Sequence, residues 1–153
     1  MTRNKSGFRL VRCDVLGRLT EPVSNVPETF LDHARGSADH YAVVGFTVPW
    51  VSYGAVYHDR IVGGGAFMGA PINGTVEIGF FTLGLFERQG FGTATARALV
   101  NIARRTEPCT IVTAKTAPER SASTRVLRKL RFYQNGHILD THLKKVLLWQ
   151  LKL

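Results

Sequence analysis

The 153-residue sequence has few cysteines and no long hydrophobic run, and each absence excludes a class of protein. Cys13 and Cys109 are too few for a disulfide framework and lack metal-site spacing, and the five histidines are scattered, so no metal site is predicted. No apolar stretch approaches the roughly 20 residues that a membrane-spanning helix needs. The basic residues at positions 1–5 precede no apolar signal-peptide core. We therefore expect a cytoplasmic protein with reduced thiols.

Acidic residues are also scarce, with 11 Asp and Glu against 20 Lys and Arg, which gives a net charge of +9. Residues 97–131 hold nine basic residues and two glutamates, a local balance of 9 − 2 = +7. The basic residues are Arg97, Arg104, Arg105, Lys115, Arg120, Arg125, Arg128, Lys129 and Arg131. They form either a solvated face or a surface for a polyanion, which would be a nucleotide cofactor or a nucleic acid. With 44% hydrophobic residues, positions 1–153 are expected to form one domain.

The residue pattern predicts strands and helices in mixed order. Strands are expected over residues 8–12, 51–57, 61–68, 75–83, 109–114, 132–139 and 145–153, and residues 41–46 are also rich in β-forming residues. A short helix is expected over residues 27–34, with Asn25 as its N-cap. A second helix follows residue 90, and a third follows a capping-box pattern at residues 116–119. Three glycines at residues 63–65 predict a bulge, a close backbone approach or a frayed edge.

A glycine loop between a predicted strand and a predicted helix is the most informative segment. Gly90 and Gly92 stand two residues apart, just before the helical pattern begins. Glycine lets a ligand approach the backbone closely, and the first amides of a helix have no intrahelical partner. The segment is therefore expected to bind a phosphate group.

The later sequence resembles a family. Residues 77–81 read Glu-Ile-Gly-Phe-Phe, residues 90–94 read Gly-Phe-Gly-Thr-Ala, and residues 121–132 carry Ser-x-x-x-x-Val-Leu-x-Lys-Leu-x-Phe. In order and spacing these segments resemble the GNAT family of N-acetyltransferases, and within it the RimJ/RimL type. The resemblance implies an α/β (α+β) fold. Its mixed, mostly antiparallel central sheet of six to seven strands has helices on both faces, and strands four and five splay apart.

The resemblance also implies a cofactor, acetyl-CoA, and a set of binding residues. The pyrophosphate would be held by the segment from Arg88 to Thr93, with Arg120 nearby. The residues of that segment are Arg88, Gln89, Gly90, Phe91, Gly92 and Thr93. Backbone groups of Phe81, Thr82 and Leu83 would align the pantetheine arm, since strand four is exposed where it splays.

The chemistry of amine acetylation assigns the remaining roles. An ammonium has no lone pair, so a base must remove its proton, and Glu77 is the candidate, acting through a water molecule. Ser123 is the candidate proton donor to the leaving thiolate. Many family members carry a tyrosine for that purpose where this chain has Leu127. Three further positions depart from the family pattern: Glu87 replaces a Gln or Arg, Arg120 an Asn and Arg131 a Gly.

Three functions remain open. The first is acetylation of a protein N-terminus or a small-molecule amine, by a monomer or homodimer that binds no membrane. The second is acetylation of an amine carried by RNA, for which the basic segment would supply binding. The third is a non-catalytic acyl-CoA-binding module, favoured by the missing tyrosine. Because Arg104, Arg105, Arg125 and Lys129 lie away from the apolar helix faces, we expect them on a solvated surface.

Overall fold

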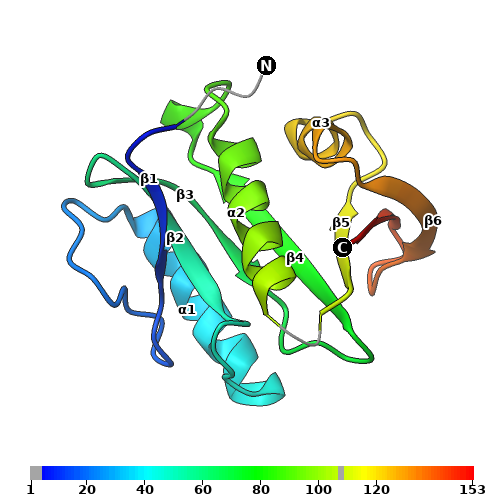
Figure 1. Ribbon diagram of the computed structural model, residues 1–153, viewed down its shortest axis with the longest axis horizontal. Helices are drawn as coiled ribbons and strands as arrows, with labels where there is room; N and C mark the ends of the chain where they lie inside the picture. Colours follow the sequence, from blue (N-terminus) through cyan, green and yellow to red (C-terminus); the bar gives the residue numbers. More distant parts are fainter. Residues whose placement is uncertain (1–4, 107–108) are drawn as a thin grey trace.

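The computed structural model describes residues 5–106 and 109–153, and within them one large sheet carries three α-helices (Figure 1). In chain order the elements are β1 (Phe8–Arg12), α1 (Glu28–Val44), β2 (Ser52–Tyr57), β3 (Arg60–Phe67), β4 (Thr75–Thr82), a 3-10 turn η1 (Gly84–Phe86), α2 (Phe91–Arg105), β5 (Ile111–Thr116), α3 (Ala122–Lys129), β6 (Tyr133–Leu139) and β7 (Lys145–Lys152). No helix in these two ranges is long and apolar enough to cross a bilayer.

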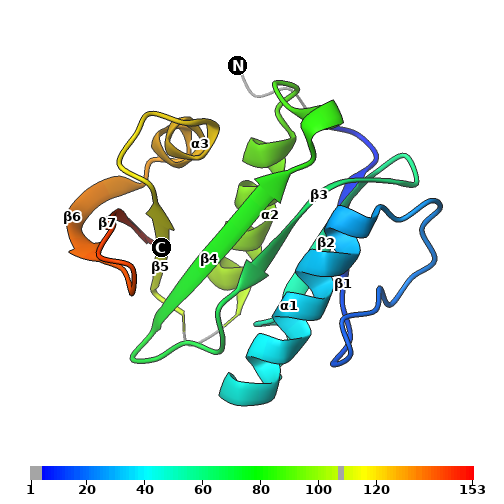
Figure 2. The same ribbon diagram turned by 180° about the vertical axis from the view of Figure 1, so that it is seen from behind.

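The sheet has seven strands in the order β1-β2-β3-β4-β5-β7-β6. All neighbours are antiparallel except β4 and β5, which run parallel and pair only over Thr75–Glu77 and Ile111–Thr113. Beyond Glu77 the two strands separate, so the second half of β4 is open toward β5. Helix α2 covers one face of the sheet and α1 the other, as the two opposite views show (Figures 1 and 2). The fold class predicted from the resemblance, including the splay, is confirmed.

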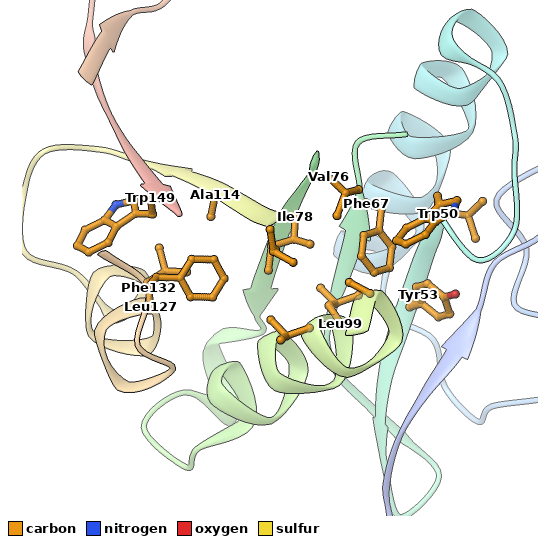
Figure 3. Close-up of a cluster of buried hydrophobic side chains, with 14 of the residues drawn as sticks. Trp50, Tyr53, Phe67, Val76, Ile78, Leu99, Ala114, Leu127, Phe132 and Trp149 are labelled. Atoms are coloured by element: carbon orange, nitrogen blue, oxygen red, sulfur yellow. The ribbon is translucent and has the colours of Figure 1, made fainter. Parts of the chain in front are cut away.

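The main core lies between α2 and the sheet and continues across the splay to α3 (Figure 3). Alternation along β4 directs Val76 and Ile78 toward α2, where Leu99 is fully buried. On the other side of the splay, Leu127 and Trp149 are buried in the same cluster. The two halves of the sheet are therefore joined by side-chain packing where backbone pairing has stopped.

The three glycines of β3 are required by close approach. A Cβ on Gly63 would lie 2.2 Å from the carbonyl oxygen of Phe81. A Cβ on Gly64 would lie 2.8 Å from the Phe81 ring, and one on Gly65 would lie 2.8 Å from Leu99. The pairing register also shifts between Ala55 and Val56 of β2, opposite this segment. Because β3 lies inside the sheet, the glycines do not mark a frayed edge.

Helix α1 corrects two predictions. It runs for 17 residues, so residues 41–44 are helical and not extended. The reason is tertiary: the Tyr41 ring is buried on the same helix face as Phe30 and Ala34, and its hydroxyl donates to the Phe67 carbonyl. The predicted cap is also wrong, because the N-cap is Pro27 and no side chain caps the helix.

The start of α3 is a further correction. The capping box is formed by Ser121 and Thr124, whereas the sequence pattern indicated residues 116–119. The Ser121 hydroxyl accepts from the Thr124 amide at 3.2 Å, and the Thr124 hydroxyl accepts from the Ser121 amide at 2.9 Å. Residues 111–116 are still strand β5, which pairs with β7 along its whole length. Sheet pairing therefore delays the helix by several residues.

The packing of β3 generates a stability prediction. Gly63→Ala should lower the free energy of unfolding by about 1–3 kcal/mol, because the added methyl meets backbone that cannot yield easily. The control is Gly36→Ala in α1, where a Cβ meets nothing within 4 Å and should raise helix stability by up to about 1 kcal/mol. Urea denaturation measures both; equal effects of the two variants would contradict the close approach.

Candidate active site

The loop between β4 and α2 has the geometry of an anion site. Arg88 and Gly90 both have positive φ, at 62° and 84°, and α2 starts immediately after Gly90. The first helical hydrogen bond runs from the Ala94 amide to the Gly90 carbonyl at 3.1 Å, and no side chain caps the helix. The amides of residues 91–93 therefore have no acceptor within the helix, at its positive end.

The second glycine of the loop provides space. A Cβ on Gly92 would lie 3.2 Å from the Thr82 hydroxyl oxygen and 3.5 Å from Val126 of α3. The start of α2 thus lies against the end of β4 on one side and against α3 on the other. A larger residue here would intrude on both neighbours.

A cleft of about 440 Å³ opens at this junction. Its walls come from β4, the loop, α2 and α3: Thr82, Phe86, Glu87, Arg88, Gly90, Phe91, Gly92, Thr93, Ala122, Arg125, Val126 and Lys129. The structure therefore brings together six of the predicted cofactor residues: Thr82, Arg88, Gly90, Phe91, Gly92 and Thr93. Gln89 instead donates to the Leu85 carbonyl at 3.3 Å, and Arg120 is exposed in the loop before α3.

The register of β4 assigns its backbone groups. The Leu83 amide donates to the Val62 carbonyl, and the Glu77 carbonyl accepts from the Met68 amide. In an antiparallel pair such bonds involve alternate residues, so the odd-numbered residues of β4, Phe81 included, bond toward β3. The polar backbone groups of Ile78, Phe80 and Thr82 then face the opening toward β5. Among the three residues predicted to align the pantetheine arm, only Thr82 has this orientation.

Two basic residues of α3 are exposed, as expected for a solvated face, and they also line the cleft. Arg125 and Lys129 line the cleft together with Ala122 and Val126, because positions i, i+3, i+4 and i+7 share one helix face. Arg104 and Arg105 lie exposed in the last turn of α2, as expected.

Lys5 is a further basic group at the loop, one that the sequence did not indicate. Its Nζ lies 4.6 Å from the centre of the Phe91 ring. Its Cε would be 3.4 Å from a Cβ placed on Gly90. The lysine is about 85 positions from the loop in sequence, so no local motif could have placed it there.

Glu77 lies where the two strands separate. Its Oε1 is 3.2 Å from Nζ of Lys115 on β5, and its side chain is 30% exposed. Ser123 is half-buried in the first turn of α3 and does not line the cleft. Leu127, at the position of the family tyrosine, is completely buried in the core. That position therefore supplies packing here and no proton.

A second pocket, of about 430 Å³, opens beside α1. It is lined by His33, Gly36, Ser37, His40, Tyr41, Ala66, Met68, Gly79, Phe80 and Phe81. Burial lowers the pKa of His33, whose Nε2 is buried without a hydrogen-bond partner among the described residues. Sequence reasoning missed this pocket; the only signal was the spacing of His33 and His40, seven residues apart in a helix.

Comparison with known proteins identifies the family. The family described as acetyltransferase (GNAT) domain matches residues 27–133. This match spans more than half of the chain, so the chain belongs to that family. An uncharacterized N-acetyltransferase, YjdG, of Bacillus subtilis (strain 168) is 38% identical over 77 residues. That alignment covers 50% of this chain and 46% of YjdG, so the chain spans about half the length of this curated relative.

Solved structures share the fold. One is the acetyltransferase from Salmonella typhimurium that modifies the N-terminal serine of a ribosomal subunit protein; its TM-score is 0.71 at 16% identity, with 97% of this chain and 96% of that chain covered. Another is Mycobacterium smegmatis RimJ in complex with a CoA disulfide, with a TM-score of 0.66 at 16% identity and coverage of 86% and 68%. GNAT acetyltransferases use acetyl-CoA, and the cleft and its uncapped helix start suit a phosphate-bearing ligand of that kind.

The charge of the cleft generates a binding prediction. Arg125→Gln combined with Lys129→Gln should weaken CoA binding by about 10-fold or more, because each lost charge-assisted contact is worth roughly 1.5–3 kcal/mol. Arg104→Gln combined with Arg105→Gln removes the same charge away from the cleft and should change the affinity little. Calorimetric titration with CoA measures both pairs. If both double variants bind CoA with equal affinity, Arg125 and Lys129 make no contact with CoA and only form a solvated face.

Proposed function

We propose that this chain is an acetyl-CoA-dependent N-acetyltransferase of the RimJ/RimL type, acting on a primary amine. The observation that carries the proposal is the separation of β4 from β5 directly beside the uncapped start of α2. The first feature exposes backbone groups to an extended ligand, and the second offers amides to a phosphate. One cleft contains the end of β4 and the helix start, so a single cofactor can use both.

The cofactor would be held mainly by backbone groups. The amides of residues 91–93 would hold the pyrophosphate, and Arg88, Arg125 and Lys129, which line the same cleft, would provide positive charge. The pantetheine arm runs along β4, where Thr82 and Phe80 present their amides and carbonyls. The thioester would then lie near Gly79, in the middle of β4.

The reaction is direct attack by the amine. Glu77 accepts a proton from the ammonium through a water molecule, which frees the nitrogen lone pair. The nitrogen attacks the thioester carbonyl carbon, and a β4 amide stabilises the oxyanion. The C–S bond would then break, and the second proton of the nitrogen would reach the thiolate, for which Ser123 stays the candidate donor although it does not line the cleft. The ammonium and acetyl-CoA thus give the N-acetyl amide, the CoA thiol and one released proton, so atoms and charge balance.

Lys115 has a defined part in this scheme. Its ammonium lies 3.2 Å from the Glu77 carboxylate and fixes its position at the opening between the strands. The pair is partly exposed, so water has access to it, as a water-mediated base requires. Lys115 is thus a positioning residue.

The RNA-borne amine remains a second candidate because α3 presents further basic residues. Arg128 is exposed, with its guanidinium 5.2 Å from the centre of the Trp149 ring, and Arg131 follows the helix. Arg125 and Lys129, however, are already accounted for by the cofactor cleft. The non-catalytic alternative predicts CoA binding without thiol release from acetyl-CoA by any amine.

A cytoplasmic location and a single domain over residues 1–153 stay predictions.

The role of Glu77 can be tested kinetically. Glu77→Gln should lower kcat by roughly 10²–10⁴-fold, since that is the usual contribution of a general base. The affinity for CoA should stay nearly constant, because the amide conserves the shape of the carboxylate. Ser123→Ala should also lower kcat, by a smaller factor. Lys115→Gln keeps the carboxylate but removes its ion-pair partner, so it should lower kcat by a smaller factor than Glu77→Gln. Unchanged turnover in Glu77→Gln would remove this residue from the mechanism.

A further inference from the structure

The pocket beside α1, here called the α1 pocket, continues the cofactor cleft along one strand. Thr82 lines the cleft, and the three residues that precede it along β4, Gly79, Phe80 and Phe81, line the α1 pocket. A thioester laid along β4 from the cleft would carry its acyl end toward these residues. Helix α1 covers this face of the sheet (Figure 2), so a reacting carbon beside Gly79 would lie next to the α1 pocket.

The walls of the α1 pocket are apolar. Tyr41, Met68 and Phe81 supply most of the large side chains, and none of the described lining residues is Asp, Glu, Lys or Arg. The Tyr41 hydroxyl already donates to the Phe67 carbonyl. The volume of about 430 Å³ falls in the range of small-molecule sites, about 300–1,000 Å³.

The polar groups of the α1 pocket do not favour a cation. The His40 Nε2 lies 2.7 Å from the Met68 carbonyl oxygen and must donate its proton to it. Burial lowers the pKa of His33, which favours the uncharged form of this imidazole. The titratable residues that line the α1 pocket are His33, His40 and Tyr41, and the Glu77 side chain, paired with Lys115, lies on the same face of β4 two residues before Gly79. A second ammonium placed here would lose its hydration without gaining an unpaired carboxylate, because Glu77 is already paired with Lys115.

We propose that the α1 pocket binds the substituent of the acceptor amine, and that this substituent is apolar and uncharged. The acceptor class is a monoamine with an aromatic or aliphatic body, either a small molecule or a peptide N-terminus with an apolar first side chain. Polyamines, aminoglycosides and lysine-rich termini are excluded by the missing carboxylate. This inference rests on the proposed function, because it places the reactive amine against the acyl group of acetyl-CoA.

The first test compares matched acceptors on the wild-type protein. Thiol release from acetyl-CoA is measured with 2-phenylethylamine, putrescine and the peptides Phe-Ala-Ala and Lys-Ala-Ala. The apolar member of each pair should have the higher kcat/KM, by about 10-fold or more, which is the discrimination that pocket contacts supply. Preference for one apolar substrate over the other distinguishes a small-molecule from a peptide source. Equal or better use of putrescine and Lys-Ala-Ala would overturn the inference and leave the proposed function standing.

Calorimetry separates the inference from the proposed function. If no amine releases thiol, the proposed function fails, but 2-phenylethylamine should still bind the CoA complex more tightly than putrescine. Absence of that difference would overturn the inference as well.

The second test changes the charge of the α1 pocket. Ser37→Asp places a carboxylate on the wall, so the ratio of kcat/KM for putrescine to that for 2-phenylethylamine should rise by about 10-fold, equivalent to about 1.4 kcal/mol. The control is Ala42→Asp, which adds the same charge at an exposed position of α1 outside the α1 pocket. If the folded Ser37→Asp variant shows an unchanged ratio of kcat/KM for the two amines, the assignment of the α1 pocket is contradicted. If that variant does not fold, the comparison of acceptors on the wild-type protein decides the question.

Discussion

The short pairing between β4 and β5 is the constraint on which the rest of the structure depends. Only three residue pairs join these parallel strands, from Thr75 to Glu77 on β4. A continuous ladder would place the backbone groups of Phe80 and Thr82 in hydrogen bonds with β5, and the opening would not exist. The sheet tolerates the gap because the core is shared across it: Ile78 and Leu99 on one side belong to the same cluster as Leu127 and Trp149 on the other.

Close packing on the other edge of β4 keeps the strand in place. Gly63 and Gly64 of β3 let the Phe81 carbonyl and ring approach to distances that no side chain would allow. Phe81 in turn contacts the His33 ring, with ring centres 4.7 Å apart. The glycines of β3, the opening beyond β4 and the α1 pocket therefore form one connected arrangement. A substitution in β3 should therefore alter the shape of both the cleft and the α1 pocket.

The sequence predicted the parts of the site that depend on local chemistry. The glycine loop, the strand before it and the helix after it are contiguous, so spacing alone indicated an anion site. Arg125 and Lys129 are exposed, as the pattern of α3 predicts, but the sequence does not show that this exposed helix face borders a cleft shared with α2. Lys5, the ion pair of Glu77 with Lys115 and the α1 pocket all join elements distant in sequence. Tyr41 shows the same limit for the fold, since its burial against β3 extends α1.

The most direct test of the central claim is amide hydrogen exchange with and without CoA. The account predicts that CoA slows exchange at the amides of residues 91–93 and at Phe80 and Thr82, whose groups face the opening, while Phe81 and Leu83, already bonded toward β3, change little. Gly92→Glu should abolish the whole effect, since it places bulk and negative charge at the phosphate position. Gly84→Glu, where a Cβ meets nothing within 4 Å, should preserve it. Protection confined to other segments, with Phe80, Thr82 and residues 91–93 unaffected, would contradict the account.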